Sequence, residues 1–203
     1  LINNMNLKGC MAVWAVLAIG GYALQSCNTA PVKEVWLDEL GQDSCYVQDW
    51  GTVEINRSVV LTPLTVNGIV YERGFGAHSI SRILYDLKSE AVSISGLAGA
   101  DDNNRFAGKL QFKIVGDQKE LWKSGVMKKG DPVKEFNVSL KGVDKVLLLV
   151  EECGDGIMYD HADWLNVKIE TRGDVKPVRA WAKSIAKEKY ILTPPAPEVP
   201  VIN

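Results

Sequence analysis

The segment Lys109–Ile114 alternates polar and apolar residues with a period of two, reading Lys-Leu-Gln-Phe-Lys-Ile. A β-strand sends alternate side chains to opposite faces, so the apolar residues of this segment are predicted to face a core. Similar alternation recurs at 92–97 and 136–140, and Asn67-Gly68 between two apolar runs is typical of a two-residue hairpin turn. Roughly eight to ten short strands are predicted, with turn signals about every 8–12 residues and no amphipathic helix between them. The chain is therefore predicted to be all-β, as an antiparallel β-sandwich or jelly roll.

Composition, charge and the absence of catalytic motifs argue against several classes of function. The 203 residues are 46% hydrophobic, as in soluble globular proteins, and the net charge of -2 gives no basic field for nucleic acid. No P-loop, nucleophile elbow or HExxH motif occurs in the sequence. A glycosidase needs two carboxylates flanking the scissile bond, and nothing singles out such a pair among the 25 acidic residues. We expect neither a catalytic site in these residues nor a nucleic-acid partner.

Residues 1–27 are predicted to be a targeting segment rather than part of the fold. Met5–Lys8 is a short basic start, residues 11–24 are almost entirely apolar, and Leu24–Cys27 reads Leu-Gln-Ser-Cys. The basic start and the apolar run are typical of a secretory signal peptide. The last four residues resemble the bacterial lipobox, which implies lipidation of Cys27. That implies an exported lipoprotein of the cell envelope, held in the outer membrane or at the cell surface by its lipid. The alternative is an uncleaved membrane anchor.

The rest of the chain divides into a short polar tether at 28–33, the sandwich at 34–170 and a final segment at 171–203. Residues 178–189 could form one helix with an apolar face. Four prolines then fall within seven residues, a density that favours an extended spacer. The final segment is predicted to be a linker toward a further domain.

Two cysteines remain after the targeting segment, Cys45 and Cys153. In an oxidising compartment such a pair could form a disulfide. Two free thiols are an equal alternative, because no spacing argument brings these residues together.

The stretch Gly154–Trp164 holds three acidic residues, a histidine and two aromatic residues, between apolar runs at 146–150 and 165–169. Binding residues concentrate in loops that a rigid sheet holds in place. The stretch is therefore a candidate binding loop. The alternative is a turn whose aspartates cap backbone amides while Trp164 fills the core.

Five motifs occur in the order and spacing of one known family: Gly74–Ser79, Ile83–Leu87, Ala98–Asp102, Phe112–Asp117 and Asp155–Trp164. Together they resemble the NPCBM carbohydrate-binding module of secreted glycoside hydrolases, over about residues 34–170. The resemblance implies a jelly-roll sandwich with galactose-binding-like topology, whose loops at one end bind galactose-type or blood-group-like glycans. It also implies a structural calcium ion in many members. A departure from the family, Asp117-Gln118 in place of a common Asp-Gly turn, affects a turn and no ligand.

The tail Lys189–Pro194 resembles the linker that follows this module in bacterial lipoprotein α-galactosidases. This resemblance implies a covalently attached catalytic domain, an α-galactosidase, as a partner. The chain is thus predicted to be a carbohydrate-binding module that targets an attached glycoside hydrolase to galactose-type glycans. The alternative is a structural or protein-interaction sandwich without sugar affinity.

A sugar offers an apolar face and a rim of hydroxyls, which aromatic rings, carboxylates, amides, arginine and histidine can contact. The loops 71–78, 101–105 and 155–164 supply these residue types and are predicted to build the site. The candidates for ligand binding are Tyr71, Glu72, His78, Asp101, Asp102, Arg105, Tyr159, Asp160, His161 and Trp164. Each has a structural alternative, above all Trp164, whose strand alternation favours the core, and Arg105, which could pair with a neighbouring aspartate.

The calcium ligands are not assigned by the sequence. Calcium prefers roughly six to eight oxygen ligands, and no EF-hand loop is present. Acidic residues near 36–39 and within 155–163 could meet in space, because the first and last strands of a sandwich are often neighbours. A calcium site is therefore an expectation without named ligands.

Overall fold

The computed structural model describes residues 30–40 and 46–177. The targeting segment with Cys27, the predicted helix and the proline-rich linker lie outside the described residues, and so does Cys45. Within the part of the chain that is described, no helix is both long and apolar enough to cross a membrane.

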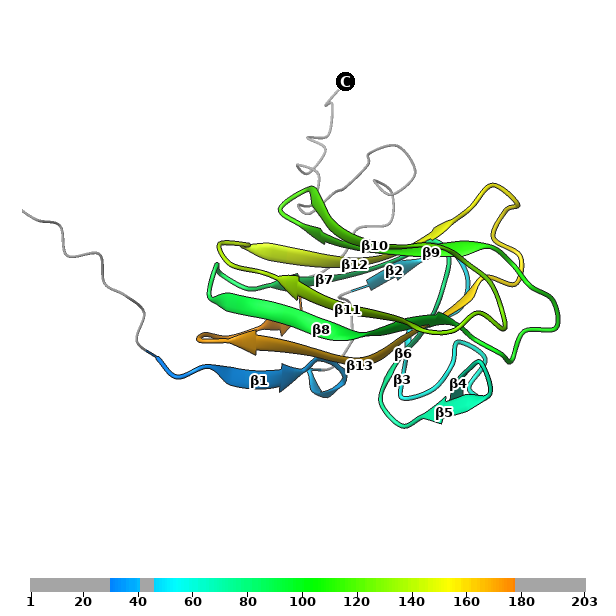
Figure 1. Cartoon of the computed structure of the whole chain (residues 1–203), viewed down its shortest axis with the longest axis horizontal. Coiled ribbons are helices and arrows are strands. Elements are labelled where there is room, and N and C mark those ends of the chain that lie inside the picture. The colour runs from blue at the N-terminus through cyan, green and yellow to red at the C-terminus, as the bar shows by residue number, and fades with distance from the viewer. Residues whose placement is uncertain (1–29, 41–45, 178–203) are drawn as a thin grey trace, which may run out of the picture.

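Two six-stranded antiparallel sheets pack face to face, which confirms the predicted all-β sandwich (Figure 1). The first sheet has the order β11 (Lys134–Ser139), β8 (Ala91–Ala100), β13 (His161–Thr171), β6 (Gly74–His78) and β3 (Glu54–Ile55), and β1 (Lys33–Trp36) also pairs with β13. The second has the order β10 (Lys119–Met127), β9 (Leu110–Gly116), β12 (Lys145–Glu152), β7 (Ser81–Asp86) and β14 (Lys176–Pro177), and β2 (Tyr46–Gln48) also pairs with β7. A short 3-10 turn, η1 (Leu37–Glu39), follows β1.

The core lies between the two sheets, where the alternating apolar residues meet. Leu110, Phe112 and Ile114 of β9 are buried, as their alternation predicts. Trp164 of β13 is completely buried, and the rings of Phe112 and Phe136 meet it edge-on, with centroids 4.9 and 5.7 Å away. Edge-to-face packing adds to the large apolar area that an indole buries. Trp164 is therefore a core residue, and the prediction that it binds ligand is wrong for this structure.

A separate two-stranded hairpin, β4 (Leu64–Val66) and β5 (Ile69–Tyr71), lies against the first sheet. Asn67 and Gly68 form its turn with φ of 49° and 76°, the left-handed conformations that a type I′ turn requires. The inner residues of β4 are buried against Leu165, whereas Ile69 and Val70 are exposed. The hairpin predicted from the Asn-Gly pair is confirmed.

The boundaries of the last strands differ from those that the sequence predicts. β13 begins at His161, so the loop before it is four residues shorter than the predicted stretch 154–164. The reason is that His161 and Ala162 already find a backbone partner in β6, and Ala162 another in β8. Strand pairing also continues to Pro177 through β14, beyond the predicted end of the sandwich at residue 170. Among the described residues Cys153 has no disulfide partner, and burial raises the pKa of its thiol.

Candidate functional site

One end of the sandwich, on the right in Figure 1, gathers the loops that carry most of the predicted site. Strands β2, β6, β8 and β12 end there, and β7, β9 and β13 begin there. Backbone hydrogen bonds join these loops: Asp49 N–H donates to the Ile80 carbonyl (3.1 Å) and Ser79 N–H to the Asp160 carbonyl (3.2 Å). Residues far apart in sequence are therefore held together on a rigid frame.

An exposed tryptophan, Trp50, lies at this end, just after β2. Trp50 is 49% exposed, and its ring is nearly parallel to that of His161, at 6° with centroids 5.9 Å apart. His78, which pairs with His161 across β6 and β13, has its ring centroid 5.1 Å from Trp50 and 5.6 Å from His161. We call these three residues the Trp50 cluster. An exposed aromatic face beside polar ring edges suits a ligand that is apolar on one side and polar at its rim.

Local hydrogen bonds hold the cluster in place. Gln48 links two of its members, because its amide group donates to the Trp50 carbonyl (2.8 Å) and accepts from His78 N–H (2.9 Å). His78 Nδ1 donates to the Ser79 carbonyl at 2.6 Å, which leaves Nε2 as a free acceptor. His161 Nδ1 is buried without a hydrogen-bond partner among the described residues.

Both imidazoles are kept neutral near pH 7. Burial lowers the pKa of His78 and, together with the nearby His78, that of His161. A neutral imidazole has one donor and one acceptor nitrogen, which matches a hydroxyl group. The carboxylate of Asp49 adds a negative charge that acts on both His78 and the buried guanidinium of Arg82, whose pKa is also lowered by burial.

Asp160 fixes the loop before β13 rather than facing outward. Its carboxylate is completely buried and accepts a hydrogen bond from Ser79 Oγ at 2.5 Å. Gly108 lies so close to its other oxygen that a Cβ there would collide with it. Burial raises the pKa of Asp160 to about 6. The predicted ligand-binding role of Asp160 is not supported by this position, since the side chain has no exposed surface.

Asp101 and Asp102 bind the hairpin to the loop after β8. Asp101 is completely buried and accepts hydrogen bonds from the backbone N–H groups of Thr65 (3.3 Å) and Asn103 (2.6 Å). Asp102 accepts one from Gly68 N–H at 2.7 Å. These aspartates act as structural links because their oxygens satisfy loop and turn amides. The predicted sugar contact is excluded by burial for Asp101, whereas Asp102 stays partly exposed.

A further carboxyl group, that of Asp163, is buried next to Asp101. The Asp163 side chain is completely buried, and the carboxylate of Asp101 and the backbone of Thr65 lie close to it. Its pKa is raised well above the ordinary value, first by burial and then by the negative charge of Asp101. Burial in such surroundings disfavours the charged form of a carboxyl group.

Arg105 and Tyr159 belong to a second exposed aromatic patch at the same end. The guanidinium of Arg105 lies over the ring of Phe106, 5.3 Å from its centroid. Phe106 is 52% exposed and meets Tyr159 edge-on at 4.9 Å. Among the described residues Arg105 forms no ion pair, so the alternative pairing with a neighbouring aspartate is not observed. Both residues stay accessible to a ligand.

The two remaining candidates, Tyr71 and Glu72, lie apart from the loop end. Tyr71 is the last residue of β5 and Glu72 follows it, before β6 begins, whereas His78 is the last residue of β6. Tyr71 packs on the small core of the hairpin. The structure thus brings together His78, His161, Arg105 and Tyr159 at one end and adds Trp50, Arg82 and Phe106, which the sequence did not single out.

No group of three or more histidine, cysteine or carboxylate side chains in the described ranges is placed to hold a metal ion. Asp38 and Glu39, part of the predicted calcium site, instead bind Arg73 at 3.0 and 2.6 Å. Trp36 lies opposite Lys168 in β13, so these acids lie beside the middle of that strand, not at the loop that precedes it. The structural calcium ion therefore stays a prediction without a ligand set.

Comparison with known proteins agrees with the fold. The family model described as NPCBM/NEW2 domain matches residues 33–170. The chain is 29% identical over 130 residues to alpha-1,3-galactosidase B of Akkermansia muciniphila, which covers 62% of this chain and 16% of that protein. It is 29% identical over 162 residues to a candidate endo-alpha-N-acetylgalactosaminidase of Renibacterium salmoninarum, which covers 77% of this chain and 11% of that protein. The chain thus spans less than a fifth of either relative.

Two solved structures are similar in fold. The CBM51 from Clostridium perfringens GH95, in complex with methyl-galactose, has a TM-score of 0.61 at 25% identity, over 68% of this chain and 99% of that chain. The CBM51-2 and INT domains from Clostridium perfringens ZmpB have a TM-score of 0.63 at 24% identity, over 68% of this chain and 32% of that chain. The family model covers most of the described sandwich, and the chain belongs to the NPCBM/NEW2 domain family of carbohydrate-binding modules.

Proposed function

We propose that the module binds terminal galactose-type residues at the Trp50 cluster and so keeps an attached glycoside hydrolase, an α-galactosidase, near its substrate. The observation that carries the proposal is the exposed Trp50 ring beside two buried, neutral imidazoles. Support comes from a similar module whose structure holds methyl-galactose and from a galactosidase relative.

The cluster matches the chemistry of a galactose ring. The axial 4-hydroxyl of galactose leaves a continuous C–H face on one side of the ring, which an exposed indole can cover. The hydroxyls at the rim both donate and accept, as do His78 and His161 in their neutral forms. The exposed carboxylate of Asp49, near His78, supplies a charged acceptor for a hydroxyl group.

Such a site binds weakly, and its use depends on tethering. A few hydrogen bonds of about 0.5–1.5 kcal/mol each plus one covered ring face give affinities from ~10 µM to millimolar. A weak module raises the effective concentration of an attached enzyme at a polysaccharide or mucin surface, where many sugar ends are present.

Calorimetry of the chain with galactose, N-acetylgalactosamine and their α-linked oligosaccharides tests the proposal. We expect saturable binding in the ~10 µM to millimolar range without hydrolysis of the ligand. Glucose is the matched control, because its C4–H bond points to the opposite side of the ring from C3–H and C5–H, and it should bind several-fold more weakly. Absence of binding to every one of these sugars would leave the structural or protein-interaction alternative as the better description.

Galactose affinity should depend on pH in a defined direction. Because the pKa values of both histidines are lowered from 6.5, the affinity should stay constant from alkaline pH down to that value and fall in more acid solution. Protonation removes the acceptor nitrogens and places two positive charges side by side.

Asp160 also titrates in this region, with a pKa of about 6, so a second variant is needed to assign the effect. His161→Gln keeps a donor and an acceptor but has no charge to gain, and its acid loss of affinity should be smaller than that of the parent chain. An identical pH profile in the two proteins would show that the histidine does not cause the dependence.

A further inference from the structure

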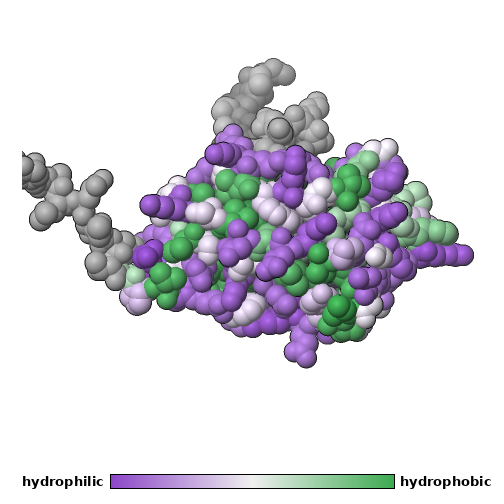
Figure 2. Space-filling view, viewed as in Figure 1, coloured by the Kyte–Doolittle hydropathy of each residue, from purple (hydrophilic) through white to green (hydrophobic). Residues whose placement is uncertain are grey.

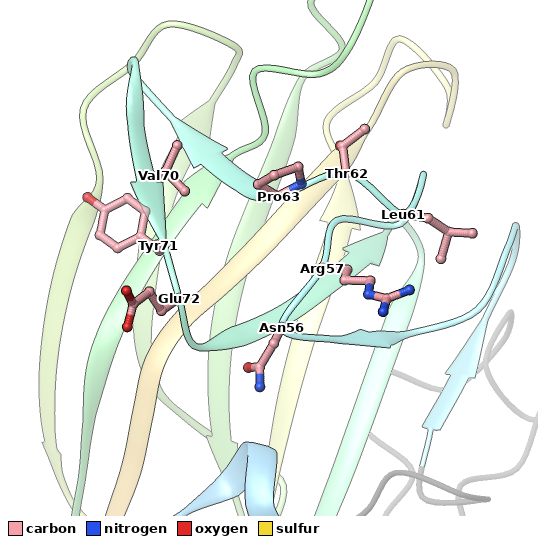
Figure 3. A pocket seen from close by; sticks show the side chains of 8 residues that line it. All are labelled: Asn56, Arg57, Leu61, Thr62, Pro63, Val70, Tyr71 and Glu72. Carbon is pink, nitrogen blue, oxygen red and sulfur yellow. The ribbon is translucent and has the colours of Figure 1, made fainter.

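A hollow of about 410 Å³ lies between β5 and the segment that links β3 to β4 (Figure 3). This volume falls within the range of roughly 300–1,000 Å³ that small-molecule sites occupy. In Figure 3, Tyr71 and Glu72 flank the hollow on one side, and Arg57 and Leu61 flank it on the other. We call it the β5 hollow. It does not include any member of the Trp50 cluster.

We propose that the β5 hollow is a second saccharide site, which takes one neutral sugar ring. This second proposal takes only one thing from the proposed function, namely that the ligand is a glycan. The residues, the shape and the charges that support it are separate from the Trp50 cluster.

The apolar side chains at the β5 hollow are unusually exposed. Leu61 and Val70 are 60% and 62% exposed, and Pro63 lines the wall between them. Ile69, the first residue of β5, is exposed as well, and Figure 2 shows apolar side chains gathered at the corner occupied by the hairpin. Contiguous exposed apolar surface with a polar rim marks binding sites. The C–H face of a sugar ring could cover it.

The polar side chains of the β5 hollow favour a neutral ligand. Arg57 and Glu72 are both exposed, and neither forms an ion pair among the described residues. A ligand with one charge would be attracted by one of these groups and repelled by the other, at the short distances of a shared hollow, so its charge gains little. A hydroxyl group can accept from the guanidinium and donate to the carboxylate, so a polyol satisfies both charges.

The wall of the β5 hollow is held in a strained but well-supported conformation. Leu61 has a φ of 67°, a region that leucine rarely adopts. Ser58 supports it, because its carbonyl accepts from Leu61 N–H at 2.8 Å and its hydroxyl contacts Thr62 Oγ1 at 2.7 Å. The backbone of Arg57 and Ser58 packs directly against Gly76 of β6, and a Cβ at Gly76 would collide with it. Strain that the surroundings maintain is typical of functional segments, and a preformed wall reduces the entropy lost on binding.

The same segment also borders the Trp50 cluster. Val59 is buried against Gly51, the residue after Trp50, and a Cβ at Gly51 would lie 3.0 Å from Val59 Cγ2. The β5 hollow and the Trp50 cluster thus lie on two sides of one rigid segment. Two weak sites on one module would raise its avidity for a surface that carries many glycans.

Nuclear magnetic resonance titration of the ¹⁵N-labelled chain tests this proposal, with methyl-galactoside and N-acetylglucosamine as probes up to about 50 mM. We expect amide shifts at 56–62 and 70–72, both in the parent chain and in Trp50→Ala. Arg57→Ala and Glu72→Gln should each weaken these shifts at least about fivefold and leave the shifts around Trp50 unchanged.

Controls distinguish binding at the β5 hollow from binding at the Trp50 cluster, and neutral from charged ligands. Arg172→Ala removes a comparable exposed arginine at the far end of β13 and should change neither set of shifts. Glucosamine and glucuronate, a cation and an anion, should bind at the β5 hollow more weakly than the neutral sugars. Shifts around Trp50 with none at the β5 hollow would overturn this proposal alone. Shifts at the β5 hollow with none around Trp50 would overturn only the proposed location of galactose binding.

Discussion

Trp50→Ala is expected to weaken galactose binding by about tenfold or more while leaving the melting temperature nearly unchanged. The indole is the largest exposed surface of the Trp50 cluster, and its loss removes the face on which the sugar ring would lie. The backbone carbonyl that Gln48 binds remains in alanine, so the turn keeps its hydrogen bond. Calorimetry with methyl-galactoside and a thermal melt measure the two quantities.

Trp36→Ala is the matched control for this substitution. Trp36 also carries an indole at the surface, where Arg73 lies over its ring at 4.3 Å, but it belongs to β1 rather than to the loop end. Its replacement should leave galactose affinity unchanged. Equal loss of affinity in the two variants, or full affinity in Trp50→Ala, would show that the sugar does not lie on Trp50.

Local sequence patterns predicted the sandwich because strand alternation and turn formation depend on residues that are close in sequence. The alternation of β9 and the Asn67-Gly68 turn each depend on neighbours within a few residues, and both appear in the structure as expected. The start of β13 was misplaced because its first residues are strand-forming only through pairing with β6 and β8. Such pairing partners are not visible in a local window.

The candidate site was harder to predict because its residues acquire their roles from distant partners. An acidic residue in a polar loop has the same local signature whether it faces a ligand or binds a buried amide. Asp101 does the latter, with a partner 36 residues away in Thr65. Trp50 was missed for the opposite reason: its turn has no periodic pattern, and only the folded chain places it beside His78 and His161. A tryptophan followed by a glycine, Trp50-Gly51, was the signal available in the sequence.

Trp164→Ala is expected to lower the free energy of unfolding by about 3–5 kcal/mol, a large part of the ~5–15 kcal/mol that stabilises a domain. Trp164 is completely buried between Phe112 and Phe136, and alanine would leave a cavity that these rings cannot fill. The melting temperature should fall by roughly 10 °C or more. A stable variant that has lost only sugar affinity would instead restore Trp164 to the binding site.

Trp164→Phe distinguishes a packing role from a binding role even if the alanine variant does not fold. The indole Nε1 has no hydrogen-bond partner among the described residues, so phenylalanine removes an unsatisfied donor along with part of the ring. The loss should be about 1–2 kcal/mol, smaller than for alanine, because most of the buried area is kept. Galactose affinity per folded molecule should equal that of the parent chain, because the Trp164 ring is buried in the core and is not part of the Trp50 cluster. Reduced affinity in a fully folded Trp164→Phe protein would mean that Trp164 also affects the binding site. In that case the packing of Trp164 in β13 would control the position of His161 in the same strand.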